Sequence, residues 1–429
     1  MLEKAKGTQD IPPEEKILRD EIISKLKKVF EAYGYSPFET PIIEKLDILY
    51  AKAGAGEESD AYKEIFKLTD QGGRKLGLRF ELTLSLARFI GMNTSIKMPF
   101  KRYELGQVFR DGPIKLGRYR QFWQCDVDAI GSKEMLADAE MIMLALDCFK
   151  QMGLDAYLQV NNRKLLKGII EFAGINQELS DSVIITVDKL TKYGKEQVEK
   201  ELREKGLNDK EIKTLLKIFE INGSNKQKIE KLKKIVNNNS AQEGLKELEE
   251  IFSYLGQNKK VTFNIALARG LVYYTGPIFE GYLRKSKIIS SICGGGRYDK
   301  MIGMLLGNER DYPATGISFG LDVIADAIKL DGKKIKKTVT KAYIIPIATE
   351  KKCISIVKQL RDAGINSEMD IMNRGVSKNL DYASKLGIPY VIFAGKKELS
   401  RKKVKLRDMK TGRERMITVK QVVKALSNQ

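Results

Sequence analysis

The chain has 429 residues, of which 76 are Lys or Arg and 56 are Asp or Glu, giving a formal net charge of +20. At roughly 150 residues per domain this length predicts about three domains, and a hydrophobic content of 42% suffices for large cores and excludes wholesale disorder. The chain contains no histidine, which excludes Ser-His-Asp and Cys-His triads, imidazole zinc sites and any histidine general base.

The sequence predicts a cytoplasmic protein with no membrane partner. Its four cysteines are far apart and form no CxxC pair, so neither a zinc cage nor a secreted disulfide framework is expected. The N-terminus lacks the apolar segment of a signal peptide, and no run of about 18 apolar residues could span a membrane. Any chemistry must therefore use carboxylates, Arg, Lys, Tyr, amides and bound ligands.

The positive charge is concentrated near the C-terminus. Residues 331–429 contain 24 basic and 9 acidic side chains, a net charge of +15, whereas residues 1–330 contain 52 and 47, a net charge of +5. A basic module of this kind predicts a polyanionic partner such as nucleic acid. From charge alone, a basic surface that serves only solubility is an equally good interpretation.

The first expected element is an amphipathic helix from Ile11 to Tyr33. Asp10 is placed to cap its N-terminus, apolar side chains recur at helical spacing, and Gly34 can end it. A motif rich in proline follows and breaks the helix.

A hairpin is expected next, with its turn at Gln71-Gly72-Gly73. Its second strand would place Arg79, Glu81 and Thr83 on one face, because side chains alternate along a strand. The apolar residues between them would lie on the other face.

A second hairpin is expected from the strand-like stretches 101–110 and 119–130. The basic side chains around its long loop are Arg110, Lys115, Arg118 and Arg120. Such a group, with glycines that allow close backbone approach, suits phosphate binding. A solvated hairpin tip is the alternative interpretation, and for a single charged hairpin it is normally the better one.

Three polar side chains share one face of the strand 119–130, namely Gln124, Asp126 and Asp128. Gln124 and Asp128 are about 13 Å apart along a strand, so side chains reaching from both could bracket a small zwitterionic ligand. The alternative is an acidic strand face turned to water.

Helices dominate the middle of the chain. A helix is expected over 135–152, and Lys/Glu/Leu-rich patterns over 162–257 predict a helical insertion. Strand character returns over 261–282 and 287–293. After the polar linker 329–340, strands alternate with helices as in a small α/β domain.

Two further segments carry chemistry. In Ala268–Gly276, an arginine stands beside glycine and two tyrosines, an unusual group to bury without a ligand. In Cys293–Asp299, three glycines are expected to end a strand before an Arg-Tyr pair.

Taken in order, these segments resemble histidyl-tRNA synthetases, which are class II aminoacyl-tRNA synthetases, and most closely their archaeal and eukaryotic branch. The resemblance runs nearly end to end and rests on several long motifs. These are KGTQDIPPEE at the start, YGYSPFETPIIE with Pro41 for motif 1, LGQVFRD and GRYRQFWQCDVDAIG for motif 2, LARGLVYYTGPIFEG and ICGGGRYDKMIG for the two histidyl segments, and PATGISFGLDVI for motif 3.

The resemblance implies an α+β fold with a six- to seven-stranded antiparallel catalytic sheet, in a homodimer formed through motif 1. The implied domains are 1–160 and 259–328 for the two parts of the catalytic domain, 161–258 for a helical insertion that clamps the tRNA acceptor arm, 329–340 for a linker, and 341–429 for an α/β anticodon-binding domain. The implied reaction joins histidine and ATP, taken with Mg²⁺, into histidyl-adenylate and then transfers histidine to tRNA(His).

The resemblance also implies roles for single residues. Arg110 and Arg269 would act on the α-phosphate, and Arg118 would join them in binding ATP. The residues implied to bind histidine are Glu81, Thr83, Gln124, Asp128, Tyr273, Tyr274 and Tyr298. Among these, Gln124 would hold the backbone end of histidine and Asp128 its imidazole. No protein-bound metal is expected.

Two positions depart from the family pattern. Val323 stands where motif 3 normally has an ATP-stacking arginine, and Val272 replaces the aspartate of the histidyl segment. One alternative is therefore a non-catalytic paralogue that regulates histidine biosynthesis, although such proteins usually lack the anticodon domain and the histidyl-specific arginine that this chain keeps. The other is a nucleic-acid-binding or histidine-sensing module on the same fold.

Overall fold

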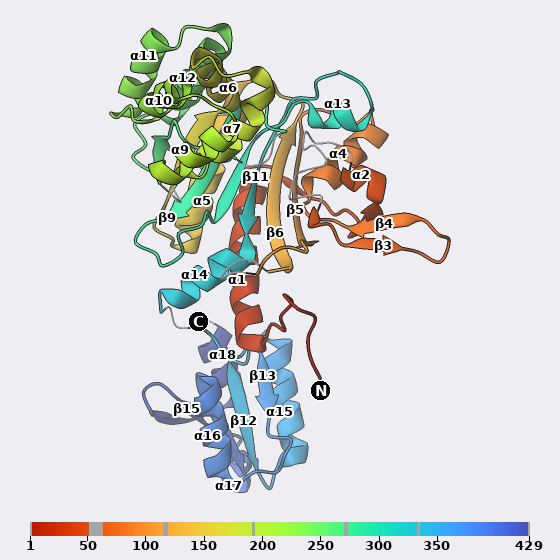
Figure 1. Cartoon of the computed structure of the whole chain (residues 1–429). Coiled ribbons are helices and arrows are strands. Elements are labelled where there is room, and N and C mark those ends of the chain that lie inside the picture. Colours follow the sequence, from red (N-terminus) through yellow and green to blue (C-terminus); the bar gives the residue numbers. More distant parts are fainter. Residues whose placement is uncertain are drawn as a thin grey trace. The chain divides into compact units, whose positions relative to one another are not determined.

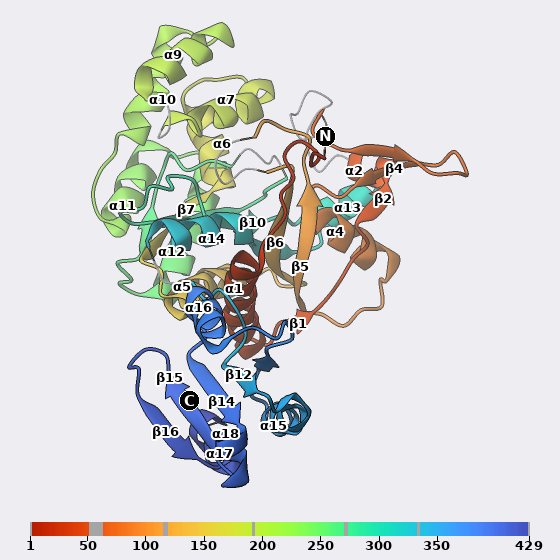
Figure 2. The same cartoon turned by 90° about the horizontal axis from the view of Figure 1, so that it is seen from below.

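The computed structural model describes residues 2–50, 63–114, 119–190, 194–269, 273–332 and 335–427. The chain divides into two compact units, one formed by Met1–Gln9 with Ile22–Gly332 and the other by Asp10–Glu21 with Lys333–Gln429. Figures 1 and 2 show the elements of both units from two directions. No helix within the described ranges has the length and apolar character needed to cross a membrane.

The first unit is built around a sheet whose described strands follow the order β1-β5-β6-β11-β10-β9-β7-β8. The six middle strands are antiparallel to their neighbours, while the short β1 and β8 run parallel at the two edges. The predicted antiparallel sheet is thus confirmed, and the edge strands bring it to eight. The strands are β1 (Ser36–Pro37), β5 (Phe100–Phe109), β6 (Gln121–Ile130), β7 (Ala156–Asn162), β8 (Val261–Phe263), β9 (Pro277–Leu283), β10 (Cys293–Arg297) and β11 (Ala314–Gly320).

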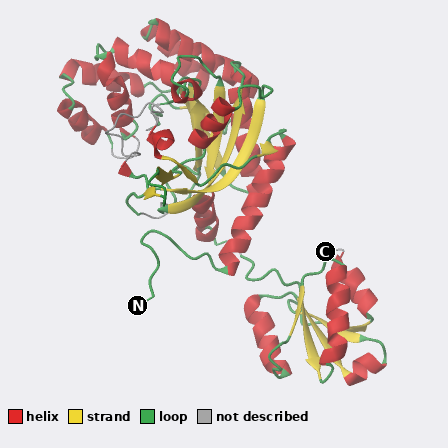
Figure 3. Ribbon diagram, turned by 90° about the vertical axis from the view of Figure 1, so that its right-hand side faces the viewer, coloured by secondary structure: helices red, strands yellow, loops and turns green. Residues whose placement is uncertain are grey.

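Helix α5 (Met135–Met152) and the part of helix α1 (Pro13–Ala32) from Ile22 onward pack on one face of this sheet, whose twist is visible in Figure 3. The ring of Phe319 on β11 lies 5.9 Å from that of Phe30 and 6.3 Å from that of Phe149, measured between centroids. The predicted helix over 135–152 has the bounds expected, and α1 begins two residues later than predicted. This face is therefore the apolar core, and polar side chains of the strands lie on the other face.

A smaller sheet shows where one strand prediction was wrong. It consists of β2 (Ile43–Lys45), β4 (Lys75–Leu78) and β3 (Lys67–Thr69), next to α2 (Leu46–Tyr50). The hairpin β3–β4 is confirmed, but its second strand ends at Leu78, and helix α4 (Thr83–Met92) begins where the strand was expected to continue. Leu82, Leu86 and Ile90 are buried at helical spacing, and this pattern prevails over the alternation that suggested a strand.

The glycine triplet does not end a strand, as the sequence suggested, but lies inside β10 (Cys293–Arg297), between β9 and β11. The stretch just before it, expected to be a strand, has no strand structure. Side chains would not fit there: a Cβ on Gly295 would lie 1.9 Å from the carbonyl oxygen of Gly316. The absence of side chains permits the close approach of the neighbouring strands, which a local sequence pattern cannot reveal.

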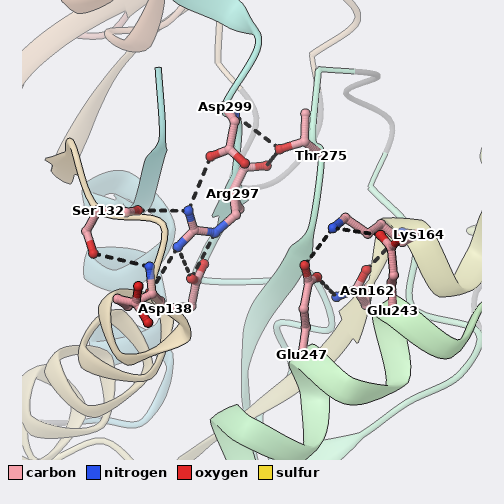
Figure 4. Close-up of polar contacts among 10 residues, drawn as sticks. Ser132, Asp138, Asn162, Lys164, Glu243, Glu247, Thr275, Arg297 and Asp299 are labelled. Carbon is pink, nitrogen blue, oxygen red and sulfur yellow. Dashed lines mark hydrogen bonds and ion pairs between the residues drawn. The ribbon is translucent and has the colours of Figure 1, made fainter. Parts of the chain in front are cut away.

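The described part of residues 163–255 is helical. Its elements are α6 (Arg163–Phe172), the 3₁₀ turn η1 (Gln177–Leu179), α7 (Ser180–Val187), α9 (Lys195–Glu204), α10 (Asp209–Phe219), α11 (Asn225–Ile235) and α12 (Asn239–Leu255). Helices α6 and α12 approach closely at two glycines, since a Cβ on Gly168 or on Gly244 would lie 2.5 Å from a backbone nitrogen of the other helix. Lys164 and Asn162 also bond to Glu247 of α12, at 2.7 and 2.6 Å (Figure 4).

The second unit contains a five-stranded sheet in the order β13-β12-β14-β15-β16, of which β13, β12 and β14 are parallel. The core residues of α15 and α18 lie with Ile344 on one face, and Ala383 of α16 lies with Tyr343 on the other. The predicted small α/β domain is confirmed. Its elements are β12 (Ala342–Ile347), α15 (Glu350–Asp362), β13 (Ser367–Met369), α16 (Val376–Leu386), β14 (Tyr390–Gly395), α17 (Lys396–Ser400), β15 (Val404–Asp408), β16 (Glu414–Ile417) and α18 (Val419–Ser427).

Candidate active site

Strand register gathers polar residues in rows across the face of the sheet opposite α1 and α5. One row runs from Glu104 of β5 through Asp126, Ser318 and Gly294 to Glu280 of β9. Because neighbouring residues of a strand point to opposite faces, Ser318 faces away from the core that contains Phe319. The chain thus brings residues separated by more than 150 positions onto one surface.

Glycines on three strands make room for charged side chains on this face. A Cβ on Gly294 would lie 1.6 Å from Nη1 of Arg269, and one on Gly316 would lie 2.0 Å from Oδ1 of Asp128. On β5, a Cβ on Gly106 would lie 2.2 Å from a guanidinium nitrogen of Arg79. The charged groups therefore lie directly against the backbone of the sheet.

Asp128 is held by two groups and is only 3% exposed. Tyr298 donates a hydrogen bond from its hydroxyl to Oδ1 (2.5 Å), and the guanidinium of Arg102 forms an ion pair with Oδ2 (2.9 Å). Burial raises the pKa of Asp128, and the charge of Arg102 opposes that rise. The alternative of an acidic strand face turned to water is therefore wrong.

Asp126 and Gln124 leave polar atoms unsatisfied on the same face. Asp126 is 3% exposed, and burial raises the pKa of its carboxyl to about 8, against the charge of Arg102. Gln124 donates from Nε2 to the Ser318 hydroxyl (3.1 Å). Its Oε1 and Oδ1 of Asp126 have no hydrogen-bond partner in the described part of the chain. Buried polar atoms in proteins are nearly always hydrogen-bonded, so these two oxygens are available to accept hydrogen bonds from a bound polar molecule.

Glu81 connects the start of α4 to the tyrosines. Its carboxylate accepts hydrogen bonds from the N–H of Leu84 (3.1 Å) and the hydroxyl of Tyr273 (3.2 Å). Burial raises the pKa of Glu81 to about 7, although Arg110 acts in the opposite direction. The ring of Tyr273 lies 4.7 Å from that of Tyr274 and 6.2 Å from that of Tyr298.

Two arginines lie at this group. Arg269 forms an ion pair with Glu280 (2.9 Å), and its guanidinium lies 5.6 Å from the ring of Tyr274. Arg110 donates from Nε to the carbonyl oxygen of Phe80 (3.1 Å) and lies 5.2 Å from the ring of Phe122. Each arginine thus lies against an aromatic ring and is anchored by hydrogen bonding or an ion pair.

Arg297, from the second histidyl segment, has a different role. Figure 4 shows its guanidinium surrounded by Asp138, the carbonyl oxygen of Ser132 (2.9 Å) and Asp299 (3.3 Å). The carbonyl oxygen of Glu134 accepts a further bond at 3.2 Å. Because all its nitrogens are engaged by the protein, this arginine is structural and fixes the end of β10 before Tyr298.

The structure therefore brings most of the predicted site residues together. A continuous chain of contacts joins Glu81, Asp128, Arg269, Tyr273, Tyr274 and Tyr298. Arg110 acts electrostatically on Glu81, and Gln124 bonds to Ser318 on the same face of the sheet. Thr83 is buried on the first turn of α4. Arg118, Lys115 and Val272 lie outside the described residues. Val323 is 8% exposed on α14 (Leu321–Leu330), which begins within the last part of motif 3 and extends into the expected linker.

The sequence did not identify the buried charges that support the site. Arg79 donates to Glu104 (2.9 Å) and to the carbonyl oxygen of Thr40 (2.7 Å), and Arg102 is fully buried beside Asp128. The alternation of Arg102 and Glu104 with apolar residues in a strand was the available signal. Asp128, the partner of Arg102, lies on the neighbouring strand, whereas Arg79 and Thr40, the partners of Glu104, lie outside the strands. These contacts therefore follow only from the tertiary structure.

Comparison with known proteins bears directly on this site. The family model described as histidyl-tRNA synthetase matches residues 7–324, and the one described as anticodon binding domain matches residues 341–429. The chain belongs to the histidyl-tRNA synthetase family. A relative described as histidine–tRNA ligase 1, from Bacillus cereus, is 42% identical over 417 residues, which cover 96% of each protein.

Other members extend the comparison. A histidine–tRNA ligase of Aeropyrum pernix is 38% identical and covers 92% of this chain and 90% of its own. The crystal structure of histidyl-tRNA synthetase from Nostoc superposes with a TM-score of 0.87 at 28% identity, covering 100% of this chain and 99% of that one. With ligases matching nearly the whole chain, it is an aminoacyl-tRNA synthetase, and the catalytic interpretation is supported over the regulatory one.

A structure described as an ATP phosphoribosyltransferase regulatory subunit/histidyl-tRNA synthetase, from Bacillus halodurans, has a TM-score of 0.75 at 22% identity. At that identity the likeness extends to the fold alone. The distinction between a synthetase and a regulatory subunit therefore depends on the relatives found by sequence and on the residues of the candidate active site.

Proposed function

We propose that this site joins histidine to ATP, forming histidyl-adenylate and pyrophosphate, and then transfers the histidyl group to the 3′ end of tRNA(His). The observation that carries the proposal is the position of Arg269 beside Tyr274, in a chain of contacts that runs through Tyr273 to Glu81 and Asp128. A cation is thereby placed next to a group of carboxylates and phenols. That combination suits an amino acid bound beside a phosphate.

These residues offer contacts to both ends of histidine. Glu81 carries the negative charge that would pair with the α-ammonium group, and Gln124 and Thr83 would complete the contacts with the backbone end. Asp128, fixed by Tyr298, would accept a hydrogen bond from the imidazole, and the tyrosine rings would enclose it. A site that hydrogen-bonds a polar side chain rejects apolar analogues strongly.

The chemistry needs positioning and positive charge. The carboxylate of histidine attacks the α-phosphorus of ATP in line, the bond to the pyrophosphate breaks, and pyrophosphate leaves. Arg110 and Arg269 would bind the α-phosphate and stabilise the charge that develops on it. The substrate carboxylate is the nucleophile, so a chain without histidine is fully equipped for the step.

Mg²⁺ would accompany ATP. Within the described ranges, no three Cys, Asp or Glu side chains are arranged to hold a metal ion. Mg²⁺ bound with nucleotides is usually held by phosphates and water with few protein ligands. No step proposed for this chain passes through a protein-bound metal.

The tRNA would contact two parts of the chain. We place its anticodon on the basic domain 341–429 and its acceptor arm on the helical insertion 161–258. In the sequence, this insertion separates the two catalytic parts, 1–160 and 259–328. The homodimer would form through motif 1, where Ile42 and Ile43 are 40% and 50% exposed. The described cysteines are free thiols, which suits a reducing cytoplasm.

The test is ATP–pyrophosphate exchange with each of the twenty amino acids, in the absence of tRNA. Exchange with histidine alone is expected, and it would also demonstrate that Val323 is compatible with ATP binding. A folded dimer that exchanges with no amino acid would instead favour the histidine-sensing alternative, whose support is the valine at this position.

The pKa of Glu81 predicts a pH dependence. With a pKa of about 7 in the free enzyme, Glu81 is neutral below that pH and ionised above it. Because the ionised form would attract the α-ammonium group, kcat/KM for histidine should rise as the pH increases through 7. The substrate imidazole also titrates near pH 6.5, so the comparison is made with Glu81→Gln.

In that variant, kcat/KM at pH 8 should fall about 10- to 100-fold, the value of a charge-assisted hydrogen bond, and the inflection from Glu81 should disappear. An identical pH profile in both proteins would contradict the role of Glu81. Circular dichroism controls for folding.

The basic C-terminal segment 331–429 predicts a salt dependence. Deletion of residues 331–429 removes a net charge of +15 and should weaken tRNA binding and flatten its dependence on salt concentration, because fewer counterions are released. Histidine-dependent exchange without tRNA should persist. An unchanged salt slope in filter-binding titrations would contradict assignment of this domain to tRNA.

A further inference from the structure

Glu280 forms an ion pair with Arg269 through one carboxylate oxygen and accepts a hydrogen bond through the other. Nη1 of Arg269 lies 2.9 Å from Oε1 of Glu280, and the two side chains are 18% and 13% exposed. The hydroxyl of Tyr282, two residues further along β9, donates a hydrogen bond to the other carboxylate oxygen, Oε2. Both oxygens of Glu280 are thus engaged, so this carboxylate has a fixed position toward the arginine.

The guanidinium of Arg269 is confined further by the sheet. Gly294 pairs with Glu280 in the β9–β10 register, and a Cβ at Gly294 would lie 1.6 Å from Nη1. The Tyr274 ring lies 5.6 Å away. Nε of Arg269 is buried and has no hydrogen-bond partner within the ranges the structure describes.

The contrast with Arg297 indicates what this arrangement serves. Arg297 bonds to carboxylates and carbonyl oxygens all around its guanidinium, as a structural arginine does (Figure 4). Arg269 forms an ion pair with Glu280, and Asp188 also acts on its charge, but its Nε has no hydrogen-bond partner among the described residues. A buried ion pair by itself contributes little to stability. Because Nε of Arg269 remains without a hydrogen-bond acceptor, the guanidinium can still donate to an additional anion.

We propose that Glu280 is a positioning residue, which orients the guanidinium of Arg269 toward the α-phosphate, and that Tyr282 fixes Glu280. This inference rests on the proposed function, in which Arg269 binds that phosphate. Glu280 itself contacts neither histidine nor ATP, and its effect passes through the arginine.

Glu280→Gln keeps the shape of the side chain and removes its charge. In histidine-dependent ATP–pyrophosphate exchange its kcat should fall about 10²-fold, the typical effect of a misplaced catalytic group, with KM for histidine nearly unchanged. Tyr282→Phe, which leaves the ion pair in place, should lower kcat by a smaller factor. Glu201→Gln removes a glutamate–lysine pair of 2.6 Å in the helical segment and should leave kcat unchanged.

Chemical rescue separates positioning from stability. Guanidinium chloride at a non-denaturing concentration should restore part of the exchange lost in Arg269→Ala, because Glu280 remains to bind the cation, with sodium chloride as the control. The rescue should be lost in the double variant Arg269→Ala/Glu280→Gln. Glu280→Asp, which retains the charge, should recover part of the kcat lost in Glu280→Gln.

An unchanged kcat in folded Glu280→Gln, or equal rescue in the single and double variants, would overturn the positioning role while leaving the proposed function intact. Full exchange by Arg269→Ala would instead contradict the role proposed for Arg269 itself. If Glu280→Gln does not fold, Tyr282→Phe decides, since an unchanged kcat there would overturn the role of the Glu280–Tyr282 pair.

Discussion

Arg269→Ala and Arg110→Ala are each expected to lower kcat of histidine-dependent ATP–pyrophosphate exchange by about 10²- to 10³-fold, as loss of a transition-state charge partner typically does. Both arginines lie at the tyrosine and carboxylate group and could meet on one α-phosphate. The measurement is exchange at saturating histidine and ATP. Removal of either arginine should affect the reaction far more than the fold.

Arg284→Ala is the matched control for this experiment. Arg284 directly follows β9, its side chain is 44% exposed, and it lies 4.9 Å from the ring of Tyr157. It resembles Arg269 in packing against a tyrosine, but its partner Asp155 is 3.8 Å away at the surface. Exchange by this variant should equal that of the unmodified protein. Comparable losses in all three variants would refute a specific role for the two site arginines.

Replacing two neighbouring glycines of β10 by alanine should affect different properties: Gly294→Ala the rate of exchange, and Gly295→Ala the stability of the fold. In Gly294→Ala the three atoms nearest to the new methyl group all belong to the guanidinium of Arg269, the closest at 1.6 Å, so the arginine can move and the fold can persist. Its displacement should lower kcat of exchange about 10²-fold. In Gly295→Ala the methyl group meets the carbonyl oxygen of Gly316 at 1.9 Å, which is backbone and cannot move away.

Gly295→Ala should therefore destabilise the protein by about 3 kcal/mol or more, the upper range for overpacking, and thermal unfolding would reveal it. Gly375→Ala is the control, since a Cβ there meets nothing within 4 Å. A fully active Gly294→Ala variant would indicate that Arg269 tolerates displacement. Equal unfolding temperatures for Gly294→Ala and Gly295→Ala would show that the sheet yields at both positions.

Local patterns in the sequence predicted the elements with a strong period. The helix of residues 135–152 and the strands on either side of the Arg110 loop follow from apolar spacing and turn residues, and the structure confirms them. The ordered motifs also identified the family before any geometry was known. These features could be predicted because each depends on residues that are close together along the chain.

Where two local patterns competed, the sequence alone failed. The stretch from Arg79 to Thr83 alternates as a strand does, yet burial of Leu82, Leu86 and Ile90 on one helical face begins α4 there. The glycine triplet resembles a turn, yet it forms the middle of a sheet. In both cases packing against distant segments decided the outcome.

What the sequence by itself determined is the set of chemical groups: two arginines, several carboxylates and tyrosines, no histidine, and a basic C-terminal module. What only the tertiary structure decided is which of them meet. Asp128 is joined to Tyr298 across 170 residues, Tyr273 to Glu81 across 192, and Gln124 to Ser318 across 194. Such contacts depend on strand register, on the path of the connections that carry Glu81 and Tyr273, and on the space that Gly294 and Gly316 leave, none of which is encoded within a short stretch of the chain.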